Sequence, residues 1–103
     1  MSFEEMSKSF QMAFGCSSGK NYKAAIELYK EDLLQNPKNI AAMNNIAVAK
    51  INIGISESNK SYIYEAKEIL EKTMEIVNEE KNYKGGYPIA EANLKWANEL
   101  LEK

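Results

Sequence analysis

The sequence predicts an all-α fold of about five helices that pair into antiparallel hairpins within a single domain, residues 1–103. Three observations lead to this prediction. Apolar residues recur at three- and four-residue spacing in five segments, which is the period of an amphipathic helix. Clusters of serine, glycine, asparagine and proline separate these segments. Residues 50–55 alone alternate as a strand would, but no second strand is present to pair with them, so we expect a helix there as well.

The first two predicted helices cover residues 3–17 and 21–35. Apolar positions of the first are Phe3, Met6, Phe10, Ala13 and Phe14. The second has one apolar stripe, with three charged residues turned to water between its members; the stripe is Tyr22, Ala25, Ile26, Tyr29 and Leu33. Ala25 is small enough to let a neighbouring helix approach closely. Pro37 cannot continue a helix, so the second helix must end near Gln35.

Three more helices follow. Asn39 is expected to cap the third, which should be buried on more than one side because its apolar residues are Ile40, Met43, Ile46, Ala47 and Ile51. Gly54 and the polar residues 56–61 are expected to mark the next turn. The fourth helix then runs to about residue 78. A glycine-containing linker precedes the fifth, where Pro88 suits the first turn and one stripe is formed by Ala90, Leu94, Ala97 and Leu101.

Composition argues against several classes of function. All 13 basic residues are lysines in a chain of net charge −2, so we expect no nucleic-acid partner. Histidine is absent and Cys16 is the single cysteine, which removes the usual zinc sites and His-dependent triads. We therefore expect no metal and no cofactor. No apolar run approaches the length of a membrane span, and the N-terminus lacks the pattern of a signal peptide, so a cytoplasmic location is expected.

Enzymatic activity is not expected either. Glutamates on the fourth helix recur at three- and four-residue spacing beside lysines, as on a solvated helix face with ion-pair partners: Glu65, Glu68, Glu71 and Glu75. Paired-carboxylate chemistry would instead need two acids that face each other in a cleft.

A helical-hairpin repeat is visible along the chain. Met12-Ala13 lies 34 residues before Ile46-Ala47, which is the length of one helix-turn-helix unit of a solenoid. Tyr22, Ala25, Tyr29, Leu33 and Pro37 also fall at the spacing of the second helix of such a unit. In these residues the chain resembles the tetratricopeptide repeat family over about residues 5–78. That resemblance implies a short right-handed solenoid with repeats at 3–37 and 39–78 and a capping helix at 87–103.

The chain departs from the family pattern in several places. Ser9 and Met43 stand where tryptophan is preferred, and Asn78 replaces the closing proline. Ala66 lies 41 residues after Ala25, so the second repeat has gained seven residues. This insertion either lengthens both helices by about one turn each or forms a protruding loop around residues 56–60, and the sequence does not decide between them.

In the family, the first helix of each hairpin lines a concave groove in which partner peptides or helices dock. The resemblance implies that the groove residues here are Phe10, Gln11, Phe14, Asn44, Asn45, Val48 and Asn52. Asn45 carries most weight, because its amide can donate to and accept from a peptide backbone at once. For Phe10 and Phe14, packing in the core is the competing interpretation. Members that clamp a terminal carboxylate have lysine and asparagine at these two positions, so we expect a partner with apolar side chains.

Two hypotheses for function follow. The first is a protein-interaction module, an adaptor, chaperone or inhibitor whose concave face binds another protein. The second is a structural protein that associates with copies of itself, for example as a homodimer. A further candidate surface is the loop of residues 81–87, whose two tyrosines flank a Gly-Gly pair, although these tyrosines could equally pack against the last helix.

Overall fold

A computed structural model describes residues 21–79 and 87–103, and over these ranges the fold is all-α, as predicted. The described helices are α2 (Tyr22–Gln35), α3 (Ile40–Ser56), α4 (Lys60–Glu79) and α5 (Pro88–Leu101). Within the two ranges there is no strand, so residues 50–55 are helical, as expected. The predicted helix at 3–17, Cys16 and most of the 81–87 loop lie outside the described residues.

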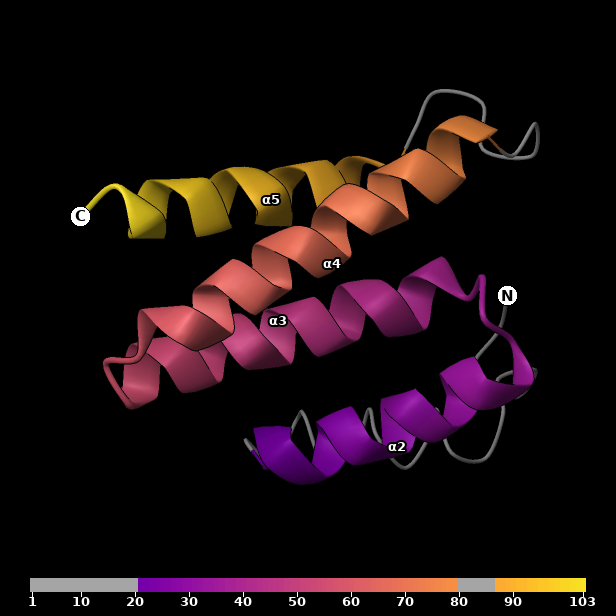
Figure 1. Cartoon of the computed structure of the whole chain (residues 1–103), viewed down its shortest axis with the longest axis horizontal. Helices are drawn as coiled ribbons and strands as arrows, with labels where there is room; N and C mark the ends of the chain where they lie inside the picture. Colours follow the sequence, from indigo (N-terminus) through magenta and orange to yellow (C-terminus); the bar gives the residue numbers. More distant parts are fainter. Residues whose placement is uncertain (1–20, 80–86) are drawn as a thin grey trace.

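Consecutive helices run in opposite directions, each beside the one before it (Figure 1). α3 packs against α2 on one side and against α4 on another, and α5 packs mainly against α4. A smaller contact joins α3 to α5, and these two helices run in the same direction (Figure 1). α3 is therefore the central helix of the described part, which agrees with the prediction that it is buried on more than one side.

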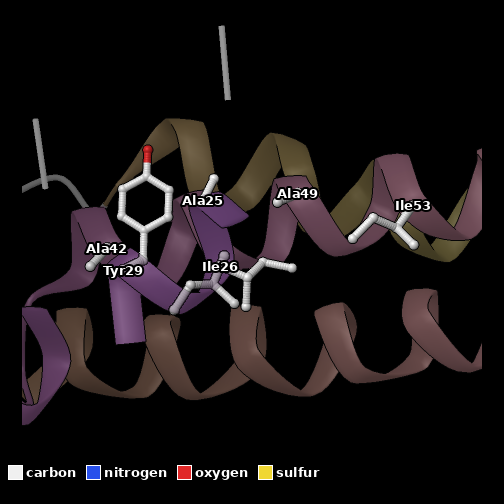
Figure 2. Packing of buried hydrophobic residues seen from close by; sticks show 7 residues of the cluster. Ala25, Ile26, Tyr29, Ala42, Ala49 and Ile53 are labelled. Carbon is white, nitrogen blue, oxygen red and sulfur yellow. The ribbon is translucent and has the colours of Figure 1, made fainter. Parts of the chain in front are cut away.

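The predicted stripe of α2 forms its contact with α3. Ala25, Ile26 and Tyr29 are buried, and Tyr22 and Leu33 pack at the edge of the same cluster. Figure 2 shows the three buried α2 side chains near Ala42 and Ala49 of α3, with Ile53 of the same cluster further along that helix. The charged residues that lie between members of this stripe in the sequence are exposed; they are Glu27, Lys30 and Glu31. The helical period thus separates the apolar and charged residues of α2 as the sequence predicts.

The turn from α2 to α3 is held by Asn39, which has the capping role predicted for it. Its side-chain oxygen accepts a hydrogen bond from the backbone N–H of Ala42 at 3.1 Å, and its amide nitrogen donates to the carboxylate of Asp32. Asp32 is buried, although its position in a charged stretch of α2 gave no indication of this. One asparagine therefore caps α3 and also provides a partner for a buried charge at the end of α2.

The turn from α3 to α4 is short. α3 continues to Ser56 and α4 starts at Lys60, so residues 56–60 do not form a protruding loop. The Asn59 N–H donates to the Gly54 carbonyl at 2.9 Å and the Ser58 N–H donates to Ile55 at 3.3 Å, which is the Schellman pattern of a helix C-terminus. Asn59 also accepts from the Ser61 N–H at 3.0 Å and so caps α4.

Gly54 lies inside α3 and does not mark the turn itself, contrary to the expectation from the sequence. A Cβ atom at this position would lie 2.7 Å from Cγ1 of Ile63 and 3.0 Å from the carbonyl oxygen of Asn59. The residue is therefore glycine because α4 approaches the last turn of α3 too closely for a side chain.

α5 starts at Pro88, as predicted, and buries Ala90 and Ala97 against a cluster that includes Ile51, Ala66 and Leu70. Leu94, Trp96, Leu100 and Leu101 pack around the edge of this cluster. At the far end of the helix, the Lys60 ammonium donates to the backbone oxygen of Lys103 at 2.8 Å. α5 thus covers the side of α4 that faces away from α2.

Replacing Gly54 with alanine is expected to destabilise the fold. Alanine is favoured over glycine inside a helix by about 1 kcal/mol, but the overlap with Ile63 and Asn59 should outweigh this and leave a net loss of about 1–2 kcal/mol. Urea unfolding followed by circular dichroism measures the change. Ser56→Ala, an exposed substitution on the same turn, serves as the control and should alter stability little; a stabilised Gly54→Ala variant would contradict the close approach.

Replacing Ser58 with glycine is expected to stabilise the fold. Ser58 has a φ of 52°, in the left-handed region where a Cβ atom is unfavourable. Glycine should relieve about 0.5–1 kcal/mol of strain, since it adopts this conformation freely. The matched change Ser56→Gly should have the opposite sign, because Ser56 is helical. Thermal unfolding of the two variants side by side tests this contrast, and a shift in the same direction for both would refute it.

Candidate functional site

Four of the predicted groove residues lie in the described part of the chain, all on α3: Asn44, Asn45, Val48 and Asn52. Phe10, Gln11 and Phe14 are outside it. Asn45, Val48 and Asn52 recur at three- and four-residue spacing, so they occupy one face of the helix, and all three are half-buried. We refer to these three residues as the α3 face.

The amide of Asn45 is the most distinctive group on the α3 face. No residue of 21–79 or 87–103 makes a hydrogen bond to it. A half-buried amide has given up part of its hydration, so it gains from any donor or acceptor that a ligand brings. Beside it, Val48 offers an apolar side chain.

Asn52 connects the α3 face to a hollow of about 540 Å³. Its amide nitrogen donates to the Val48 carbonyl at 2.9 Å, which fixes the side chain against the helix. The hollow lies where the start of α2 meets the end of α3, and its described lining is Asn21, Tyr22, Lys23, Asn52, Ile53, Ile55, Ser56 and Glu57. Apolar and amide groups are thus combined in one concave surface, as in many ligand sites.

An ion pair forms part of the lining of this hollow. The Lys23 ammonium on α2 lies 2.9 Å from the Glu57 carboxylate at the end of α3. The pKa of Lys23 is raised above its ordinary value, first by the hydrogen bond to Glu57 and then by the negative charge of that carboxylate. Lys23 is therefore charged throughout the physiological pH range and joins α2 to the end of α3 beside the hollow.

Asn44 has a different environment from its neighbour Asn45. Its side chain is 4% exposed, and its oxygen accepts a hydrogen bond from the Asn93 amide of α5 at 2.9 Å. This contact ties α3 to α5. Asn44 is consequently used inside the fold and has almost no surface to offer a partner, unlike the other three α3 residues of the predicted groove.

Sequence reasoning missed the hollow and the Asn44–Asn93 contact. Both depend on residues that are far apart in the sequence, and the amide pair spans 49 positions. The charges of Lys23 and Glu57 were visible in the sequence, but nothing there indicated that they meet. The one available signal for Asn44 was its position among apolar residues in a largely apolar helix.

Two kinds of site are not found among the described residues. No group of three or more Cys, Asp or Glu side chains within 21–79 and 87–103 is arranged to hold a metal ion. In the same ranges, every helix is too short or too polar to cross a membrane.

The comparisons with known proteins found no match: no protein-family model matches the chain, and no curated protein or solved structure matched it either.

Removing the Asn44 amide is expected to weaken the fold. Asn44→Ala leaves the half-buried Asn93 amide without its acceptor and should lower the free energy of unfolding by about 0.5–1.5 kcal/mol. Asn45→Ala, the same change one residue further on, should alter stability by less than about 0.5 kcal/mol. Urea unfolding of Asn44→Ala, Asn93→Ala and the double variant measures the coupling between the two amides. Strictly additive losses would mean that the contact contributes nothing.

Proposed function

We propose that this chain is a small protein-interaction module of tetratricopeptide-like architecture, and that its α3 face binds a peptide or helix of another protein. The observation that carries the proposal is the Asn45 amide, half-buried and without a hydrogen-bond partner among the described residues. Binding is then the function, with no chemical step. Such a module would act as an adaptor, a chaperone or an inhibitor.

The chemistry of the α3 face suits a partner backbone and an apolar side chain. Asn45 can donate to one peptide group and accept from the next, while Val48 and the hollow beyond Asn52 receive a side chain. α3 carries a single charged residue, Lys50, which pairs with Glu65 of α4 at 3.1 Å. A partner segment that meets the α3 face should therefore be uncharged there, since it would find no compensating charge.

The helix arrangement supports the proposed architecture. Consecutive helices alternate in direction, and α3 and α5 run parallel with α4 packed against both (Figure 1). In a tetratricopeptide-like solenoid these two would be the first helices of successive units and would line the same concave side. The predicted helix at 3–17 would extend that side, with Phe10, Gln11 and Phe14 next to the α3 face.

Asn45→Ala is expected to weaken partner binding about tenfold without changing stability, because one hydrogen-bonding side chain is lost from the interface. The partner is first isolated by affinity purification with the tagged chain from its native host, and binding of the purified pair is then measured by calorimetry. Asn78→Ala, which removes an exposed asparagine from the end of α4, is the matched control and should bind as the wild type does.

Equal affinity for the Asn45→Ala variant and the wild type would remove the α3 face from the proposal. Self-association is the second candidate function, because Leu34 on α2 is 84% exposed and Ile89 on α5 is 58% exposed. Light scattering at two protein concentrations distinguishes this candidate. A mass that rises with concentration and falls in a Leu34→Ser or Ile89→Ser variant would favour it.

A further inference from the structure

α5 continues the side of the molecule that carries the α3 face. The two helices run in the same direction (Figure 1), and the Asn93 amide of α5 donates to Asn44 of α3 at 2.9 Å, which fixes their register. Both helices rise by about 1.5 Å per residue. Val48 comes four residues after Asn44, and Trp96 comes three residues after Asn93, so these two side chains lie at nearly the same level.

The helical period places the open side of α5 beyond its contact with α3. α5 packs mainly against α4, and its fully buried residues are Ala90 and Ala97. At about 100° per residue, Asn93 lies about 50° round the helix from these alanines, and Ile89 and Trp96 lie about 90–110° round in the same sense. Ile89 and Trp96 are thus on the side of α5 that is turned away from α4.

The same period gives the matching side of α3. Gly54 marks the side of α3 that meets α4, because α4 leaves no room there for a side chain. Asn44 lies about 80° round from Gly54, and the α3 face follows at about 120–180° in the same sense. This rotation is opposite in sense to the one on α5, so both helices turn their open surface to the same side of the molecule. Val48 is the α3-face residue nearest to α5, and it converges with Trp96.

Ile89 and Trp96 provide an apolar surface with one free donor, and we refer to them as the α5 wall. Ile89 is 58% exposed, while Trp96 is half-buried at the edge of the cluster between α3, α4 and α5. The indole N–H of Trp96 donates to no residue of 21–79 or 87–103. No polar side-chain atom in these ranges is both buried and without a partner, so the indole nitrogen reaches the surface. Tryptophan in such a position is well suited to an interface.

The groups on this surface favour an extended partner over a helical one. All residues of the α3 face and the α5 wall are uncharged, and two groups have no partner in the described part of the chain, the Asn45 amide and the Trp96 N–H. Peptide carbonyls are acceptors for both. In a helix these carbonyls are already bonded, except in its last turn. An extended segment keeps its carbonyl and N–H groups available.

We propose that the partner of the α3 face is an extended, uncharged segment that places one large apolar side chain between Val48 and Trp96. Its backbone meets the Asn45 amide and the indole N–H on either side of that side chain. This inference rests on the proposed function and adds to it a second helix, a specificity-determining residue and the conformation of the partner. Burial of the apolar side chain supplies affinity, whereas a charged side chain in its place would find no opposite charge.

The test uses the fact that Trp96 is the only tryptophan of the chain, so the protein gives one indole N–H signal. Three short peptides with blocked ends consist of serine and glutamine apart from one central residue, which is leucine, alanine or aspartate. Each is titrated into the isotopically labelled full chain, and the indole signal and the side-chain amide signals of Asn45 are followed by NMR. We expect the leucine peptide to shift both saturably and to bind about fivefold more tightly than the alanine peptide. The aspartate peptide should bind more weakly still.

Two variants test the role of the indole donor. Trp96→Phe keeps an aromatic ring and removes the N–H, so it should weaken binding of the leucine peptide about three- to tenfold, as measured from the Asn45 signals. Tyr64→Phe removes a polar hydrogen from an exposed aromatic residue of α4 and should bind as the wild type does. Thermal unfolding of both variants verifies that the fold is kept.

Three outcomes would overturn the proposal. One is equal affinity for the leucine and alanine peptides, which would mean that no apolar side chain enters between the two helices. Another is a shift at Asn45 without a shift of the indole signal, which would leave the proposed function on the α3 face alone. The third is the absence of saturable shifts at millimolar peptide; the proposed function is then still decided by binding of the partner to the Asn45→Ala variant.

Discussion

The described fold depends on close approach between helices at small residues. Seven alanines have no exposed surface, and each lies where one helix meets another; they are Ala25, Ala42, Ala47, Ala49, Ala66, Ala90 and Ala97. A methyl group lets two helix backbones come near enough for larger side chains to interlock on either side, as Tyr29 and Ile26 do against α3 (Figure 2). Gly54 is the extreme case of this close approach, since even a Cβ atom there would overlap Ile63 of α4.

This close packing determines what α3 can present to solvent. Three helices of the described part contact it, and it contains one charged residue, Lys50, whose ammonium lies 3.1 Å from the Glu65 carboxylate. Most of the helix surface is consequently used for packing. What remains half-exposed along its length is a narrow strip that includes Asn45, Val48 and Asn52. The candidate site is therefore confined to this strip by the packing of the other helices, and its neutral chemistry follows from the scarcity of charge in α3.

Local signals in the sequence predicted the described helices well. The features that were not predicted depend on tertiary contacts. Capping by Asn39, the break at Pro37 and the start at Pro88 each act within a few residues, so the sequence was sufficient to place them. Whether residues 56–60 form a protruding loop or a short turn depends instead on how α3 and α4 pack together. Gly54 was misinterpreted for the same reason, because a turn and a close helix contact both favour glycine.

Adjacent asparagines show most clearly why a site is harder to predict than a fold. Asn44 and Asn45 are identical side chains about 100° apart on one helix, yet the first is tied to Asn93 of α5 and the second has no partner in the described part of the chain. In a helix that is apolar on several sides, periodicity does not tell which of the two faces inward. The location of α5 decides it. The same reasoning applies to Lys50, whose partner Glu65 lies on α4. Packing thus determines which residues share a surface, although these residues are unremarkable when read in order.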